Sequence, residues 1–93
     1  MVIIARPTIE NTAMTDANTE YSYAFPSGTT RFTIKLRNVG YPLKLAMVAS
    51  GSGTTYINIA NGQTYREKNI KGSITLYFQS PRAAMTAEIL SWV

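Results

Sequence analysis

The chain has 93 residues, with nine Lys and Arg against five Asp and Glu, which gives a formal charge of +4 at pH 7. Because 45% of its residues are hydrophobic and only 15% are charged, the composition indicates a folded domain rather than a disordered tail. It contains no cysteine and no histidine, which excludes disulfides, thiol nucleophiles, zinc fingers and imidazole bases. We therefore expect one domain over residues 1–93, without a cofactor and with a partner subunit that stabilises a small core.

The first residues hold a short apolar run, Val2–Ala5, which ends at Arg6. A secretory signal needs about 7–15 apolar residues and a membrane span about 18–20, so the sequence predicts neither. We expect the protein to be made and to remain in a cytoplasm.

Apolar and polar residues alternate along most of the chain, which is the pattern of half-buried β-strands. The polar residues 11–19 predict an irregular segment or a weak edge strand, and Tyr21–Phe25 predicts an aromatic-rich strand. In Arg31–Arg37 the apolar side chains alternate with polar and basic ones, so this strand should have a basic outer face. Leu43–Ala49 becomes apolar on both faces, so we expect a loop or another subunit to cover one of its ends.

The last part of the chain continues this pattern. Ser73–Gln79 alternates again, with its apolar side chains directed inward. Residues 81–93 include good helix formers, but the apolar ending and the neighbouring strands favour a last strand over Thr86–Trp92.

Turn residues separate these strands. Pro26–Thr29 has the length of a hairpin link, and Asn61 with Gly62 is a strong hairpin signal between Tyr56–Ala60 and Gln63–Glu67. Ser50–Gly53 predicts an exposed, mobile loop. Strands that recur about every 8–12 residues are typical of a sandwich or barrel. We therefore expect an all-β, jelly-roll-like β-sandwich with about eight antiparallel strands.

Two groups of residues allow a chemical interpretation, and neither is favoured. Gly51–Thr55 has the glycines and hydroxyls of a phosphate-binding loop, but it lacks the lysine and the following helix that a P-loop needs. The five carboxylates include no pair that an apolar pocket would divide into an acid and a base, and Glu67 lies between Arg66 and Lys68, where charge pairing is the simpler account. We expect no catalytic residue, no metal ligand and no enzymatic activity.

Positive charge is concentrated in the later part of the chain. Residues 1–30 carry a net charge of −2 and residues 31–93 a net charge of +6. This asymmetry indicates an acidic partner, although a chain with few charges also becomes lopsided by chance. The partner-binding candidates are the basic residues of the outer strand face, namely Arg31, Lys35, Arg37 and Lys44. Nucleic acid is not favoured as the partner, because an array of alternating aromatic and basic residues is missing.

The six tyrosines and the single tryptophan form another group. Flat rings suit the faces of sugars, but in a small β-domain they more often belong to the core or to a subunit interface. Large apolar side chains near strand ends are common at subunit interfaces. The candidates for an oligomer interface are Val48, Tyr77 and Trp92.

The order of several segments carries a resemblance to a known class of proteins. The segments are Asn11–Pro26, Arg31–Arg37, a Gly/Ser loop followed by Thr54–Ile57, Ile74–Gln79 and Ala87–Trp92. Together they resemble small structural proteins of tailed bacteriophages. The resemblance implies a β-rich virion component, either a capsid decoration (cement) protein or a module of a head or tail fibre, and it implies no particular functional residue.

These observations lead to two functional hypotheses. The first is a non-enzymatic decoration protein that is made in the host cytoplasm, becomes part of the virion, and cross-bridges and stabilises shell subunits. It would bind the major capsid protein or another virion protein and self-associate as a dimer or trimer. The alternative is a carbohydrate-binding module or fibre domain that recognises a host glycan. Direct DNA binding is a distant third hypothesis.

Overall fold

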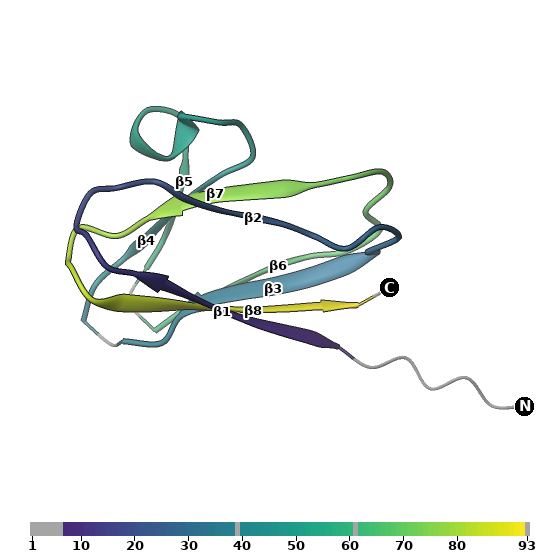
Figure 1. Cartoon of the computed structure of the whole chain (residues 1–93), viewed down its shortest axis with the longest axis horizontal. Helices are drawn as coiled ribbons and strands as arrows, with labels where there is room; N and C mark the ends of the chain where they lie inside the picture. The colour runs from purple at the N-terminus through teal and green to yellow at the C-terminus, as the bar shows by residue number, and fades with distance from the viewer. Residues whose placement is uncertain (1–6, 39, 61, 93) are drawn as a thin grey trace, which may run out of the picture.

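Eight strands form two antiparallel sheets that lie face to face (Figure 1). They are seen in a computed structural model that describes residues 7–38, 40–60 and 62–92. The strands are β1 (Thr8–Met14), β2 (Tyr21–Ala24), β3 (Arg31–Leu36), β4 (Leu43–Ala46), β5 (Ile57–Ile59), β6 (Thr64–Glu67), β7 (Thr75–Gln79) and β8 (Met85–Trp92). A 3-10 turn, η1 (Gly51–Gly53), lies between β4 and β5.

The two halves of the chain pair with each other in a nested order. Strand β1 pairs with β8, β2 with β7, β3 with β6 and β4 with β5, all antiparallel. Further pairings of β3 with β8 and of β4 with β7 join these pairs into two sheets of four strands, β1-β8-β3-β6 and β2-β7-β4-β5. This is the topology of a jelly roll, in which a long double-stranded ribbon is wound into a sandwich. The expected all-β, jelly-roll-like sandwich of eight strands is confirmed.

The core between the sheets is built from alternate strand positions. On β3, Phe32 and Ile34 are 1% and 0% exposed, and on β7 both Leu76 and Phe78 are 0% exposed. Each of these side chains faces the opposite sheet because neighbouring residues of a strand point to opposite faces. The period of two in the sequence therefore identified the inward residues correctly.

The outermost segments also form strands. The expected last strand is confirmed as β8, in which buried and half-buried residues alternate over its whole length. Residues 11–19 were expected to be irregular or a weak edge strand, and β1 is indeed an edge strand, although it starts earlier, at Thr8, and ends at Met14. Its pairing with β8 explains the earlier start, because β8 offers a partner to each residue from Thr8 to Met14.

Both expected hairpins are wrong. The link over Pro26–Thr29 makes a tight turn, with the Thr29 amide donating to the Pro26 carbonyl at 3.3 Å, yet β2 and β3 belong to different sheets. Strands β5 and β6 are also in different sheets, and between them Gly62 has a φ of +77° whereas Asn61 lies outside the described residues. Turn residues determine where the chain reverses, but they do not decide which strand then becomes the hydrogen-bonding partner.

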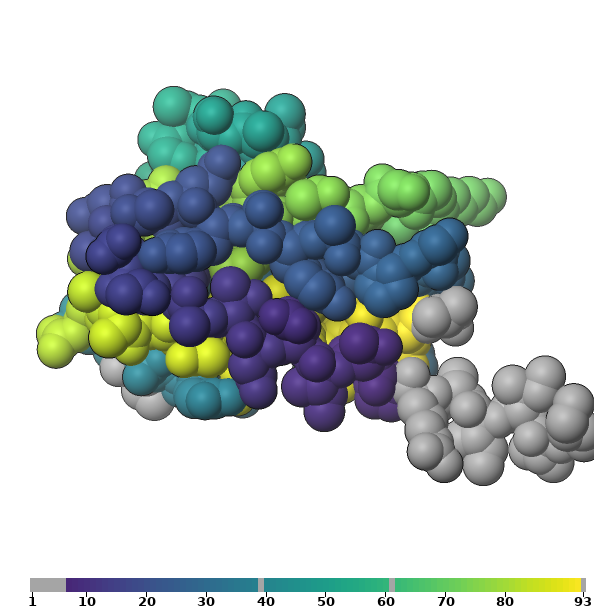
Figure 2. Space-filling model, viewed as in Figure 1, coloured from purple at the N-terminus to yellow at the C-terminus, as the bar shows by residue number. Residues whose placement is uncertain are grey.

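The segment over Ser50–Gly53 is only partly the exposed loop that was expected, because Ser50 and Gly53 are exposed but the two residues between them are not. Gly51 and Ser52 are buried, and η1 lies on the outer face of sheet β2-β7-β4-β5, where Figure 2 shows it (teal) forming the top of the molecule. The Cβ position of Gly51 would be only 3.0 Å from the Cβ of Ala46, which is 4% exposed. The chain's own loop thus covers Ala46 at the end of β4. The strand expected over Leu43–Ala49 is shorter than predicted, because it ends at Ala46, and Met47, Val48 and Ala49 beyond it are exposed rather than covered.

One carboxylate holds this loop in place. The amide of Ser50 donates to Oε2 of Glu20 at 2.8 Å, and the amide and hydroxyl of Ser52 donate to Oε1 at 3.1 and 2.6 Å. The side-chain amide of Gln79 donates in turn to the Ser52 hydroxyl at 3.0 Å. The hydrogen bond from the Ser52 hydroxyl, together with the two amides, lowers the pKa of Glu20 below its ordinary value.

The burial of the core predicts that substitutions at Ile34 and Ile9 change the free energy of unfolding by different amounts. Ile34→Val should lower the free energy of unfolding by about 0.5–1.5 kcal/mol, because Ile34 is fully buried and loses a methylene from a packed site. The matched control Ile9→Val, at a side chain that is 66% exposed, should stay within about 0.5 kcal/mol of the wild type. Urea unfolding measures both, and equal effects would contradict the assigned burial.

The hydrogen bonds to Glu20 predict that the Ser50 and Ser52 amides are protected from exchange only while the carboxylate is charged. Because the pKa of Glu20 is lowered in the folded protein, its hydrogen bonds stabilise the fold above the ordinary value of 4.5 and are lost as the pH falls through the lowered folded-state pKa. The amide protons of Ser50 and Ser52 should therefore exchange faster with solvent in Glu20→Gln than in the wild type at neutral pH. Hydrogen-exchange NMR measures this, with Glu67→Gln as the control, since Glu67 lies on the other sheet. Unchanged protection in Glu20→Gln would argue against the network.

Candidate functional site

The outer face of sheet β1-β8-β3-β6 is the open surface on which the expected basic residues lie. In β8 the inward residues are buried, so Glu88, Leu90 and Trp92 point outward, and in β3 Arg31 and Lys35 point outward in the same way. Figure 1 shows no described element below this sheet, whereas η1 covers part of the other one. We call this surface the basic face.

The strand register places two kinds of side chain side by side on the basic face. Ile9 of β1 lies opposite Leu90 of β8, which pairs on its other side with Thr33 of β3, and Thr33 pairs with Arg66 of β6. Arg31 pairs with Trp92 one row further along. At this end of the face the β1-β8 half carries the apolar side chains Ile9, Leu90 and Trp92, and the β3-β6 half carries the cations Arg31 and Arg66. Further along the same strands the β1-β8 half is polar, with Asn11 opposite Glu88.

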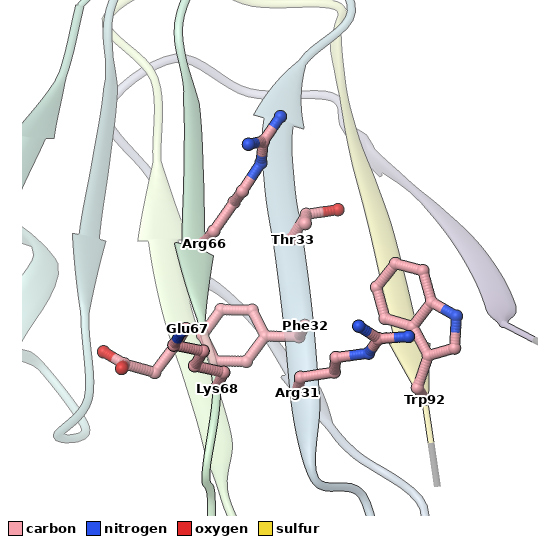
Figure 3. Close-up of a pocket in the computed structure, with 7 residues that line it drawn as sticks. All are labelled: Arg31, Phe32, Thr33, Arg66, Glu67, Lys68 and Trp92. Carbon is pink, nitrogen blue, oxygen red and sulfur yellow. The ribbon is translucent and has the colours of Figure 1, made fainter.

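A shallow groove of about 630 Å³ runs over the cationic half. Figure 3 shows Arg31 extending from β3 toward Trp92, and Glu67 pointing away from both. The residues that line the groove are Arg31, Phe32, Thr33, Arg66, Glu67, Lys68 and Trp92.

Arg31 and Trp92 are stacked, with the guanidinium carbon 4.4 Å from the centre of the indole ring. A cation over an aromatic face is attracted by the ring electrons, which restricts the rotation of the arginine. One face of the only tryptophan is consequently covered by a cation, and the guanidinium is held at the edge of the groove.

Lys35 and Arg37 are already paired with a carboxylate. Lys35 Nζ lies 3.4 Å from Glu88 Oε1, and Arg37 Nε donates to Glu88 Oε2 at 2.9 Å. The hydrogen bond from Arg37, with a smaller contribution from Lys35, lowers the pKa of Glu88 below its ordinary value. Their positive charge is thus partly neutralised. Within residues 7–38, 40–60 and 62–92, no carboxylate forms an ion pair with Arg31, Arg66 or Lys68.

The structure brings together three of the four partner-binding candidates. Arg31, Lys35 and Arg37 share the basic face, but Lys44 lies on β4 of the other sheet, with its Nζ 5.0 Å from the ring centre of Tyr56. The grouping of Lys44 with the others was wrong, because β3 and β4 follow each other in sequence but belong to different sheets.

Two cations of the groove, Arg66 and Lys68, were missed by the sequence interpretation. Their spacing of two residues places both on one side of an extended segment, which is a usable signal. That this side joins the β3 face follows only from the pairing of β3 with β6.

The three candidates for an oligomer interface do not form one surface. Val48 is 66% exposed and precedes η1 over one sheet. Tyr77 is half-buried and pairs with Ala46 on that same sheet, whereas Trp92 lies on the basic face of the other. A self-association that uses all three would need more than one contact surface.

The aromatic side chains do not gather into a platform. Tyr21 and Tyr23 pack against the core, as does Tyr65, and burial raises the pKa of both Tyr23 and Tyr65. Trp92 and Tyr56 lie over different sheets, and each has a cation over its ring. Most of the tyrosines therefore serve packing, as the sequence favoured.

Two further observations apply to the described parts of the chain. In these parts no group of three Asp or Glu side chains is close enough to hold a metal ion. They also contain no helix of the length and hydropathy that a membrane crossing requires.

Comparisons with known proteins extend only to the fold. No family model and no curated protein matches the chain. A solved structure described as a de novo designed double-stranded beta-helix is similar in fold, with a TM-score of 0.57 and 16% identity over 95% of this chain and 99% of that one. At this identity the similarity shows a shared architecture and says nothing about function.

The pairing of Glu88 predicts a pH-dependent contribution to stability. Because the pKa of Glu88 is lowered in the fold, its ion pairs stabilise the protein above the ordinary value of 4.5 and are lost as the pH falls through the lowered folded-state pKa. Glu88→Gln should lower the free energy of unfolding by up to about 1 kcal/mol at pH 7, since the pair is near the surface, and by nothing in acid. Urea unfolding of the variant and the wild type, at pH 7 and again in acid below the folded-state pKa of Glu88, measures this difference. Asp16→Asn, on the turn after β1, is the control, and a difference that persists in acid would contradict the assignment.

Proposed function

We propose that the protein is a non-enzymatic structural component of a virion, a capsid decoration (cement) protein that bridges neighbouring shell subunits of a tailed bacteriophage. The observation that carries the proposal is the basic face. There three cations, Arg31, Arg66 and Lys68, have no ion-pair partner among the described residues, and the same face carries the exposed Ile9 and the half-buried Leu90 and Trp92. Such a mixed surface suits binding to an acidic protein surface rather than chemistry on a small molecule.

The fold supports this proposal by analogy. Jelly rolls are common in viral capsids, and the same fold also occurs in lectins and enzymes. The segment order that resembles phage structural proteins adds to it.

A bridging protein needs two contact surfaces, and the molecule offers two. The basic face is one. The other lies near η1 on the opposite sheet, where the exposed apolar side chains are Met47, Val48, Tyr56 and Ile57. Because each surface belongs to a different sheet, one copy would touch two neighbours at once. Association of the protein with itself, as a dimer or trimer, would cover the apolar surface in the same way.

The alternative is a domain that recognises a host glycan, and Trp92 at the edge of the groove is the observation that favours it. The support is weaker, because Arg31 already covers one face of the Trp92 ring and the exposed Tyr56 lies over the other sheet. A glycan array probed with the purified protein decides this point, and hits that disappear in Trp92→Ala would favour the alternative over decoration.

The proposal predicts binding to assembled shells. The purified protein should sediment with empty shells built from the capsid protein of the same genome and should raise the temperature at which they open. Val48→Asp, an exposed substitution on the apolar surface, should still bind through the basic face but stabilise the shells less. Native mass spectrometry of the free protein gives its oligomeric state. No sedimentation with shells, or shells with an unchanged opening temperature, would contradict the proposal.

A further inference from the structure

We infer that the basic face binds an extended, acidic segment of a partner protein that also carries an apolar side chain. The inference rests on the proposed function, since it names what the partner would insert at this face. It depends on the order of the side chains across the sheet rather than on the overall charge.

The cationic half extends beyond the groove. A second hollow of about 480 Å³ shares Arg31 and Lys68 with the first and is also lined by Ile70 and Lys71. Together with Arg66, four cations follow one corner of the sheet. Glu88 lies two rows from Arg31 and is paired with Lys35 and Arg37. Glu67 also lines the groove, but its side chain points away from Arg31 (Figure 3).

The apolar half lies directly beside it. Ile9, which is 66% exposed, pairs with Leu90, and both line a third hollow of about 290 Å³ that shares Thr33 with the groove. From β1 to β6 the face spans three strand spacings of about 4.8 Å, or about 14 Å. A partner that contacts both Ile9 on β1 and Arg66 on β6 therefore needs an apolar group and an anionic group about 14 Å apart.

An extended peptide satisfies this distance. Its residues rise about 3.4 Å each and alternate between two faces, so side chains four residues apart point the same way and lie about 14 Å apart. We therefore expect an apolar residue that precedes or follows a pair of carboxylates by four positions.

The stacking of Arg31 on Trp92 favours carboxylates over bases or sugars. One face of the indole is occupied by the guanidinium at 4.4 Å, so a base or a sugar ring would have to displace it in order to stack there. The same stacking holds the planar guanidinium, whose N–H groups bind a carboxylate in a two-point arrangement. A nucleic-acid backbone would meet the cations but would leave Ile9 and Leu90 without an apolar partner.

The test uses synthetic probes and the fluorescence of Trp92, the only tryptophan of the chain. The main probe is a serine-based peptide in which one leucine precedes two glutamates by about four positions. The comparison probes are the same peptide without leucine, an oligothymidine of equal charge and a sulfated heparin oligosaccharide. The peptide with leucine should bind about tenfold more tightly than the one without it.

Matched variants separate the face from general attraction by charge. Lys68→Glu should weaken binding of the leucine peptide about tenfold, whereas Lys44→Glu, which changes the net charge equally but lies on the other sheet, should change it by less than about twofold. Thermal unfolding checks that both variants fold.

Three results would overturn the inference: equal effects of the two lysine variants, no benefit from leucine, or tighter binding of oligothymidine or heparin than of the peptide. Shell binding distinguishes the two proposals. If the protein binds shells but does not bind the leucine peptide, only this inference is contradicted. If the protein binds the peptide but does not bind shells, only the decoration proposal is contradicted.

Discussion

The nested pairing of the two halves of the chain is the constraint on which the rest of the structure depends. Strand β8 lies between β1 and β3, so a segment at the end of the chain joins two segments from its first part. The basic face is a direct result, because this pairing puts Trp92 beside Arg31 and Leu90 beside both Ile9 and Thr33. A shift of one residue in this register would turn every side chain of β8 to the other face.

The loop between β4 and β5 lies at the middle of the nested pairing order, and the Glu20 carboxylate holds this loop in place. The loop between β4 and β5 folds back over its own sheet and buries Gly51 and Ser52 there. Backbone amides that leave solvent need partners, and the Glu20 carboxylate accepts two of them from a distant part of the chain. A carboxylate of the acidic first part thus has a structural role, and it also holds in place the segment that carries the exposed Val48.

The distribution of charge has a clearer meaning in three dimensions. Part of the positive charge along the sequence is used within the protein, since Lys35 and Arg37 share Glu88. Of the cations without an ion pair among the described residues, Arg31, Arg66, Lys68 and Lys71 lie at one corner of the basic face, whereas Lys44 lies on the other sheet. Such a surface can select a partner by the positions of its apolar and anionic groups as well as by its net charge.

By itself the sequence determined the fold class, the inward residues of β3 and β7, the last strand and the basic character of the β3 face, because alternation and turn residues are local properties. It did not determine which strands become neighbours. The expected hairpin at Asn61 and Gly62, the place of Lys44 and the contribution of Arg66 all depend on pairings between residues far apart in the chain. Only the tertiary structure decided these, because strand partners are selected by burial of the whole sheet face rather than by the residues of one turn.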